Sequence, residues 1–368
     1  MSKHYSVPWL PLPYDLETKA VLRQANIANK KLAELKGVAT TIPNEGILIS
    51  TLTLQEAKES SAIESIVTTH DDLYRAEIDI HKDLISASTK EVLNYRQAIL
   101  FGFDMIRKDK VLSANRIKQI QEHIEHNRAG FRTLPGTTLK DSQGAVVYTP
   151  PQSAIEIEEH MANLEAFINN NAMSDYDPLI KMAIIHHQFE SIHPFYDANG
   201  RTGRIVNILY LIINDLLDLP ILYLSRFVTQ NKGEYYRLMQ AIRDKDGDNS
   251  REWEAWVLFI LRGVERTAED TILLVKGISQ LMGEYKAKLR PLFGKQYKHE
   301  LLNNLFFHPY TKIDFMARDL MVGRKSATKY LDTIVAAGLL SKIKMGRENY
   351  YMNDRLADLF FNIPTAEH

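Results

Sequence analysis

Apolar residues recur at spacings of three and four along most of this chain, with good helix formers between them. This period is typical of amphipathic helices that bury one face. The pattern therefore predicts a mainly α protein, with helices over 89–106, 113–126, 155–168 and 253–289.

Capping residues support this prediction. Ser113 opens one of the periodic runs, and Asp177-Pro178 places an N-cap before a proline at the first helical position. A helix is therefore expected over 178–192. It must end there because Pro194 lacks an N–H and pushes His193 away from helical geometry.

Two segments break the helical pattern. Between Gly130 and Pro151, two short β-prone runs flank a Ser142-Gln143-Gly144 turn, which predicts a β-hairpin over 137–149 that projects from the helical body. The second break follows Arg290-Pro291, where short helices and alternating runs begin.

Residues 296–368 have the order of elements of a winged helix. Thr311, together with Asp314, is expected to cap a short helix that ends at Leu320. A second helix is predicted over 324–337, and two strands over 339–343 and 348–352 form the wing.

The breaks divide the chain into three parts. We predict an N-terminal arm and helix region over 1–88, a helical catalytic domain over 89–290 and a small winged-helix domain over 295–368. The expected fold is thus a mainly α bundle that carries a hairpin flap and ends in a winged helix.

Composition narrows the classes of function. The 368 residues include 45 Lys and Arg against 46 Asp and Glu, so no global field attracts nucleic acid or anionic lipid. The absence of cysteine excludes disulfides, thiolate catalysis and Cys-ligated zinc, and makes the cytoplasm the expected compartment. No apolar run has the length of a signal peptide core or a membrane span.

The richest chemistry lies in the segment His193-Pro-Phe-Tyr-Asp-Ala-Asn-Gly-Arg-Thr-Gly-Arg204. Asn199 and Gly200 stand where the next helix begins, so its unpaired N–H groups form a natural anion site. Arg201 and Arg204 are three residues apart on its first turn, as two phosphates of one nucleotide require. Asp197 is a hard oxygen ligand suited to Mg²⁺, and His193 is a base that can accept a hydroxyl proton. Together they predict phosphoryl or nucleotidyl transfer.

The twelve residues resemble the signature of the Fic (AMP-transferase) family, H-P-F-x-[DE]-G-N-G-R-x-x-R. They match every fixed position except Ala198, where the family usually has glycine. A methyl group is tolerated there unless φ must be positive. The resemblance implies an all-α core and transfer of AMP from ATP to a protein Ser, Thr or Tyr hydroxyl. It makes His193 the catalytic base and assigns ATP to Ala198, Asn199, Gly200, Arg201, Thr202, Gly203 and Arg204.

Two simpler interpretations compete. The segment could be a polar helix start with solvated arginines and a core histidine, but the conjunction of twelve residues argues against it. Glu190 and His193 also form an E-x-x-H pair, as in di-iron bundles, yet no second such pair occurs in the chain. His186 and His187 are expected to be packing residues.

Ser60 and Glu64 lie one turn apart on a predicted helix upstream. They resemble the inhibitory motif of Fic proteins, [ST]-x-x-x-E-[GN], with Ser65 departing from the usual glycine or asparagine. The resemblance implies that Glu64 pairs with Arg204 and occupies the arginine that would hold the γ-phosphate of ATP. The alternative is an ordinary surface carboxylate.

Three further features follow the family pattern by position. The 137–149 hairpin resembles the flap that holds an extended target segment by strand addition. Tyr235 and Tyr236 resemble the nucleotide-contact region, although Arg243 stands where relatives often carry asparagine, and tyrosines at helical positions are more often core. Self-modification and a homodimer are further expectations.

The C-terminal region 311–352 is locally basic. Between residues 324 and 348, Asp332 and Glu348 are outnumbered by six basic residues, namely Arg324, Lys325, Lys329, Lys342, Lys344 and Arg347. This excess suits a DNA-contacting helix and wing, whereas a protein-docking or dimer-packing module would carry the same lysines merely solvated.

The leading hypothesis is an autoinhibited protein adenylyltransferase that uses ATP and Mg²⁺. Two alternatives remain. One is a de-AMPylase in which Glu64 orients water to remove AMP from a modified protein. The other is a DNA-binding regulator whose Fic-like site senses a nucleotide.

Overall fold

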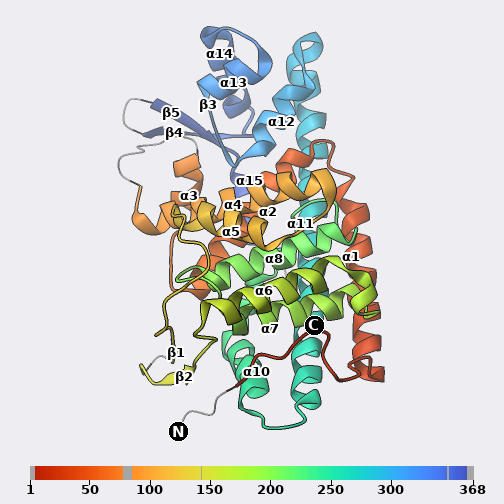
Figure 1. Cartoon of the computed structure of the whole chain (residues 1–368). Helices are drawn as coiled ribbons and strands as arrows, with labels where there is room; N and C mark the ends of the chain where they lie inside the picture. The colour runs from red at the N-terminus through yellow and green to blue at the C-terminus, as the bar shows by residue number, and fades with distance from the viewer. Residues whose placement is uncertain (1–4, 78–84, 142, 346–347, 363–368) are drawn as a thin grey trace.

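The computed structural model describes residues 5–77, 85–141, 143–345 and 348–362, and it is mainly helical, as predicted (Figure 1). A helical body forms the lower two thirds of the molecule, and a smaller module with a β-sheet caps it. In the body, the elements are α1 (Lys19–Ala39), α2 (Glu45–Ile63), α3 (His70–Glu77), α4 (Ala87–Asp109), α5 (Ala114–Glu125), β1 (Leu139–Lys140), β2 (Val146–Tyr148), α6 (Ala154–Asn169), η2 (Asn171–Met173), α7 (Pro178–Ile192), α8 (Asn199–Ile213), α9 (Ser225–Gln230), α10 (Lys232–Asp244) and α11 (Ser250–Phe293).

All five predicted helices are present, with ends that differ by at most four residues from those predicted. The caps also form as expected, because Ser113 accepts a hydrogen bond from the N–H of Arg116 and Asp177 accepts one from the N–H of Leu179. Within the described part of the chain, no helix combines the length and apolarity needed to cross a membrane.

The central pair of helices, α7 and α8, is buried on all sides. Helices α1 and α11 run side by side, and α11 also packs against α7, while α4 and α5 cover α8 (Figure 1). A helix surrounded in this way carries apolar residues around its whole circumference. The loop that joins α7 to α8 is therefore held between two rigid helix ends.

Helix α2 is also buried over most of its length, because α4, α8 and α9 of the body pack against it and α12 covers its start. Its last turn ends against the body, where Lys232 Nζ donates to the carbonyl of Ile63 at 2.6 Å. A cation at this position satisfies a carbonyl that the helix itself leaves free.

The predicted hairpin is present as β1 and β2, which pair antiparallel. Asp141 Oδ1 accepts from the N–H groups of Gln143 and Ala145, both at 2.9 Å, and Gly144 supplies the positive φ that the turn needs. The turn residue Ser142 lies outside the described residues. Tyr148 Oη donates to the carbonyl of Ser191 at 2.7 Å, which ties the hairpin to α7.

The C-terminal module follows Gly294, which ends α11 with a φ of +52°. Its sheet has the order β3-β5-β4. Its elements are η3 (Gly294–Gln296), α12 (His299–Phe307), β3 (Tyr310–Lys312), α13 (Ile313–Leu320), α14 (Arg324–Ala336), β4 (Ser341–Met345), β5 (Glu348–Met352) and α15 (Asp354–Phe361).

Both helices and both strands predicted for this module are present, but the predicted cap is wrong. Lys312 occupies the N-cap position of α13 and makes no side-chain capping bond. Thr311 lies in β3, a strand that the periodicity did not predict, and its hydroxyl donates to Asn304 Oδ1 at 2.8 Å. Sheet pairing with β5 directs Thr311 away from the helix start.

Candidate active site

The loop between α7 and α8 is closed by one side chain. Asn199 Oδ1 accepts from the N–H of Phe195, and Asn199 Nδ2 donates to the carbonyl of the same residue, both at 2.8 Å. At the other end of the loop, His193 caps α7 with a φ of +50° and its N–H donates to the carbonyl of Phe189. Asn199 therefore acts on the shape of the loop through its side chain.

Helix α8 begins at Ala198, which has a φ of +61° and gives no side-chain cap. The first N–H groups of α8 thus lack a cap and can bind an anion. A positive φ strains any residue with a Cβ, so the condition under which alanine is unfavourable is met here. This conformation explains why glycine is usual at this position of the motif.

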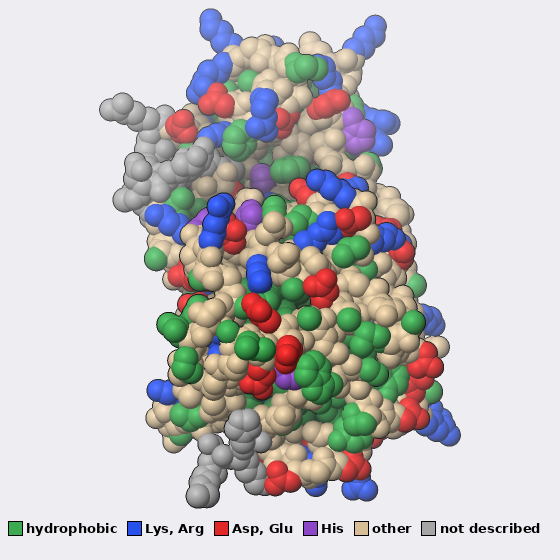
Figure 2. Space-filling model, viewed as in Figure 1, with side chains coloured by type: hydrophobic (Ala, Val, Ile, Leu, Met, Phe, Trp, Pro, Cys, Tyr) green, Lys and Arg blue, Asp and Glu red, His purple; other side chains and the backbone are tan. Residues whose placement is uncertain are grey.

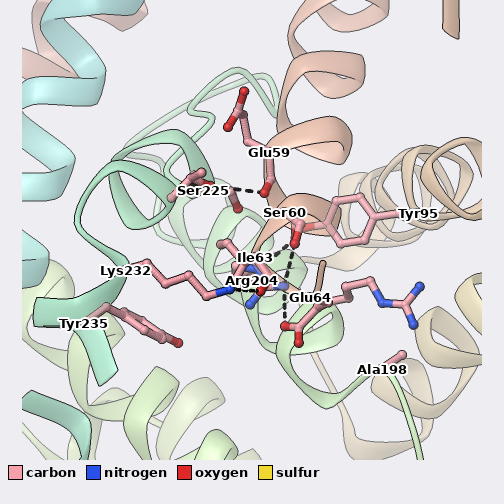
Figure 3. Close-up of polar contacts among 12 residues, drawn as sticks. Glu59, Ser60, Ile63, Glu64, Tyr95, Ala198, Arg204, Ser225, Lys232 and Tyr235 are labelled. Atoms are coloured by element: carbon pink, nitrogen blue, oxygen red, sulfur yellow. Dashed lines mark hydrogen bonds and ion pairs between the residues drawn. The ribbon is translucent and has the colours of Figure 1, made fainter. Parts of the chain in front are cut away.

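Arg204 is buried and tied to the end of α2 (Figure 3). Its Nε donates to Ser60 Oγ at 2.7 Å, and its Nη2 donates to the carbonyl of Ser60 at 3.0 Å and to Glu64 Oε1 at 2.9 Å. Burial alone would lower the pKa of Arg204, but the neighbouring Glu64 carboxylate raises it above its usual range. The guanidinium therefore stays charged.

Gly200 lies directly beneath this contact. A Cβ added there would stand 2.4 Å from Glu64 Oε1 and 2.9 Å from Arg204 Nη1, closer than real Cβ atoms approach. The glycine thus lets an anion approach the helix start, as its position in the sequence suggested. In this structure, that anion is the carboxylate of Glu64.

Arg201 has different partners from Arg204. It is 4% exposed, and its Nη2 lies 2.7 Å from Glu125 Oε1 while its Nη1 lies 3.4 Å from Glu91 Oε2. The two arginines that the sequence placed on one face are therefore held by separate carboxylates. Neither Glu91 nor Glu125 carried a signal in the sequence, because each is an ordinary polar position of a helix.

Thr202 and Gly203 face the core. Thr202 is completely buried, and a Cβ added at Gly203 would come within 3.0 Å of both Glu190 and Phe189. Burial raises the pKa of the Glu190 carboxyl to about 7, against the opposing effect of Arg204. Gly203 thus allows close packing of α7 on α8.

His193 is partly buried at the end of α7. Burial, assisted by Arg243 and Arg132, lowers its pKa to about 3, so its imidazole is neutral at physiological pH. A neutral imidazole can accept a proton, and the negative charge of bound phosphates would raise its basicity. The structure therefore gives the predicted base the required protonation state.

Arg132 holds the backbone around this histidine. Its Nε donates to the carbonyl of His193 at 2.7 Å, its N–H to the carbonyl of Pro194 at 2.8 Å, and its Nη2 to the carbonyls of Ile192 and Pro151. These bonds join the root of the hairpin to the end of α7. No motif contains Arg132, and sequence reasoning missed it.

Thr133 and Leu134, which follow Arg132, bind Tyr196. The Tyr196 hydroxyl accepts from their N–H groups at 2.9 and 3.3 Å. The side-chain hydroxyl of Thr133, 3.4 Å away, and then these two N–H groups lower the pKa of the Tyr196 hydroxyl. Every residue from 132 to 134 therefore bonds to the loop between α7 and α8.

The two tyrosines of α10 differ in environment. Tyr235 is buried, with its hydroxyl 2.8 Å from His186 Nε2 and its ring packed on Trp256. Tyr236 is 44% exposed, and burial and the nearby Glu64 raise its pKa to about 12. Tyr235 thus packs in the core of this structure, while the side chain of Tyr236 is exposed to solvent near Glu64.

Arg243 replaces the asparagine that the motif comparison led us to expect. It is buried, donates from Nε to Ser191 Oγ at 3.2 Å and stacks its guanidinium 4.1 Å above the ring centre of Tyr148. The charge of Arg243 lowers the pKa of His193, as described above.

Asp197 is the residue that would hold a metal ion. Its carboxylate is 76% exposed, and its Oδ1 accepts from the N–H of Ala198 at 2.6 Å and lies 3.9 Å from Arg201 Nη2. One open carboxylate next to a phosphate site suits Mg²⁺, which binds through one or two carboxylates and substrate phosphates.

A metal site built from protein ligands alone is not present in the described ranges, where no three or more His, Cys, Asp or Glu side chains gather. His187 Nε2 faces the carbonyl of Met239 at 3.2 Å, and His186 bonds Tyr235. Both histidines pack in the core as expected, and the di-iron alternative has no support.

In the C-terminal module, two of the predicted basic residues have acidic partners. Arg324 pairs with Asp314, and Lys342 Nζ lies 2.8 Å from Asp332 Oδ1. Figure 2 shows Lys and Arg side chains projecting from this end with Asp and Glu among them. Arg347 lies outside the described residues. DNA binding through 311–352 and the winged-helix assignment remain predictions.

Three family models match the chain in order. The model described as Fic/DOC family N-terminal matches residues 22–104, and the Fic/DOC family model matches 111–211. The C-terminal domain of protein adenylyltransferase SoFic-like matches 281–356. Together they cover helix α2, the loop between α7 and α8 and most of the C-terminal module.

Curated relatives named protein adenylyltransferase Fic are similar at low identity. The protein from Drosophila ananassae is 24% identical over 233 residues, which are 62% of this chain and 40% of that protein. The Aedes aegypti protein is 23% identical over 248 residues, 66% of this chain and 43% of its own length. The chain thus matches less than half the length of these relatives.

Solved structures share the fold. A Fic family protein from Desulfovibrio desulfuricans superposes with a TM-score of 0.57 at 17% identity, covering 92% of this chain and 97% of that one. Fic-1 from C. elegans superposes with a TM-score of 0.51 at 16% identity, over 68% and 73% of the two chains.

Proposed function

The chain belongs to the Fic/DOC family, and from this premise we propose that it is a protein adenylyltransferase held inactive by its own Glu64. It would transfer AMP from ATP to a Ser, Thr or Tyr hydroxyl of a protein target. The single observation that carries the proposal is the contact of Glu64 with Arg204 above Gly200.

The contact supports inhibition because one guanidinium cannot neutralise two competing anions. Glu64 Oε1 takes up Nη2 of Arg204, the arginine that the family resemblance assigns to the γ-phosphate. A hundredfold loss of productive ATP binding corresponds to only about 2.7 kcal/mol. One partly buried, charge-assisted pair is sufficient for this.

The neighbouring residues have complementary roles in the proposed reaction. His193 accepts the proton of the target hydroxyl as its oxygen attacks the α-phosphate, and pyrophosphate leaves. The uncapped N–H groups of α8, together with Arg204 once Glu64 has withdrawn, stabilise the charge of the leaving group. Asp197 would hold Mg²⁺, which neutralises phosphate charge when bound.

The hairpin of β1 and β2 supports the docking of the target. Arg132 and Tyr148 connect it to the backbone at 191–194, so an extended segment paired with the hairpin would lie close to His193. Main-chain pairing reads little of the target sequence. Self-modification of this chain would use the same surface.

The test is transfer of label from α-labelled ATP by the purified protein. Glu64→Gly is expected to raise transfer at least about tenfold, because it frees Arg204. Ser60→Ala should give a smaller rise, because it removes one bond to Arg204 and leaves the competing carboxylate. Glu59→Ala is the matched control, since this carboxylate on the same helix pairs with Lys58 and should leave transfer unchanged.

The same variants distinguish the alternatives. If Glu64→Gly leaves transfer unchanged and instead slows the removal of AMP from a modified protein, Glu64 is a catalytic base of a de-AMPylase. If neither reaction occurs while labelled ATP binds, the site senses a nucleotide and the protein is a regulator.

A further inference from the structure

Glu64 and Ser65 form the joint at which the chain leaves α2 and turns toward α3. Glu64 is the C-cap of α2, and α3 begins six residues later at His70. Ser65, the next residue, has a φ of +65°, a conformation that strains a residue with a side chain. The N–H groups of Ser65 and Ile66 donate to the carbonyls of Ala62 and Ser61, both at 3.0 Å, and close this turn locally. Whether the carboxylate of Glu64 reaches Arg204 then depends on how α2 and α3 are held in place.

The C-terminal module contacts the helix before the joint. Ser50 Oγ lies 3.3 Å from His308 Nδ1, and Gln55 Nε2 donates to the carbonyl of Phe360 at 3.4 Å. At the start of α2, a Cβ added to Gly46 would lie 3.2 Å from the ring of Phe307. Residues from α12 and α15 thus pack along the first half of α2.

The module also contacts the helix after the joint. Tyr310 Oη donates to Asp71 Oδ1 at 2.6 Å, and the rings of Tyr74 and Phe360 stack with centres 6.2 Å apart. His70 packs its ring on Phe361 with centres 5.3 Å apart. In Figure 1, α3 lies directly below the sheet of the module.

We propose that the C-terminal module positions Glu64 by packing against α2 and α3 on both sides of the joint. Weakening these contacts would then release Arg204 from Glu64. Tyr310 and Asp71 are positioning residues in this proposal, because they act on the reaction only through Glu64. The inference rests on the proposed autoinhibition and names the part of the chain that controls it.

The helical body also binds α2. This limits how far a change in the C-terminal module is expected to raise AMP transfer. Glu56 accepts from the N–H of Ser225 at 3.1 Å and from Tyr95 Oη at 3.2 Å, and Arg96 Nε donates to Thr53 Oγ1. These bonds do not involve the module. Loosening the module should therefore release Glu64 only part of the time.

The experiment measures AMP transfer from α-labelled ATP by full-length variants. Tyr310→Phe removes the donor of the hydrogen bond between the module and α3, and Asp71→Ala removes its acceptor, so each should raise transfer about three- to tenfold. Asp71 also pairs with Arg75, but this exposed pair lies within α3 and does not reach the module. The double variant should do no more than either single variant, because all three lose the same bond to the module.

The matched control is Tyr351→Phe. This hydroxyl donates to Asp332 Oδ1 at 3.2 Å, a bond between β5 and α14 that stays inside the C-terminal module. It should leave transfer unchanged. Thermal unfolding of all variants shows whether each one is folded.

A comparison of AMP transfer with and without Glu64 distinguishes positioning of this residue from a general loss of stability. In the Glu64→Gly background, Tyr310→Phe should have no further effect, because no carboxylate remains to be positioned. Unchanged transfer in both Tyr310→Phe and Asp71→Ala, or an equal rise in Tyr351→Phe, overturns the proposal. A failure of Glu64→Gly itself to raise transfer contradicts the proposed autoinhibition instead.

Discussion

The loop at 193–204 and the joint at 64–65 meet at Arg204, but they are built in opposite ways. Two hydrogen bonds between Asn199 and Phe195 close the loop from within, and bonds from residues 132–134 support it. Glu64 depends on a partner 140 residues away and on helices packed around it. A locally closed loop resists distant change, whereas a contact assembled from distant parts can be adjusted.

The two regions also share a feature. Ala198 and Ser65 both have left-handed backbones, with φ values of +61° and +65°, at positions where the motifs usually have glycine or asparagine. Such conformations persist only where the surroundings enforce them. In the loop, the bonds between Asn199 and Phe195 provide this enforcement. At the joint, the N–H groups of Ser65 and Ile66 bond to Ala62 and Ser61, while the direction of the Glu64 side chain depends on the helices packed around it.

The largest effect is expected in the loop. His193→Ala, made in the Glu64→Gly background, should reduce AMP transfer at least about a hundredfold, because it removes the base. ATP affinity, measured by calorimetry, should change by no more than a few fold. Transfer near the level of the Glu64→Gly parent would show that His193 is not the base.

A smaller loss is expected where the two regions meet. Arg204→Ala in the Glu64→Gly background should cancel the gain of at least about tenfold, since the released arginine is also the proposed γ-phosphate ligand. Arg237→Ala is the control, because this exposed arginine forms an ion pair with Glu234 on the same helix, α10. Retention of the gain without Arg204 would contradict its assignment to ATP.

A smaller effect is expected at Asp197, the exposed carboxylate of the loop. Asp197→Ala should shift the Mg²⁺ titration of AMP transfer about fivefold to higher concentration, the factor expected of one exposed charge contact worth ~1 kcal/mol. The carboxylate of Asp141 on the hairpin turn offers a comparison, because Asp141→Asn should leave the titration in place. An unchanged Mg²⁺ requirement in Asp197→Ala removes this residue from the metal site.

The smallest effect concerns backbone strain. Ala198→Gly should stabilise the fold by about 0.5 kcal/mol, because relief of a left-handed alanine exceeds the added chain entropy of glycine. Ala28→Gly, within a regular buried stretch of α1, should destabilise it. Urea unfolding monitored by circular dichroism measures both, and a loss of stability in Ala198→Gly would mean that the loop tolerates alanine without strain.

Local patterns in the sequence sufficed for much of the structure. The three-and-four period and the caps at Ser113 and Asp177 predicted helices that are present, and the turn at 141–144 predicted the hairpin. The motif also identified the loop and the candidate partners Glu64 and Arg204. These features depend on neighbours in the chain, so the sequence by itself carries them.

Only the tertiary structure decided which side chains meet. It separated Arg201, held by Glu125, from Arg204, and it brought Arg132 to the carbonyls around His193. It also placed strand β3 beside β5 and packed the C-terminal module on both sides of Glu64. Hydrogen bonds and ion pairs between distant segments leave no periodic trace in the sequence, because each partner is an ordinary residue until packing brings the two together.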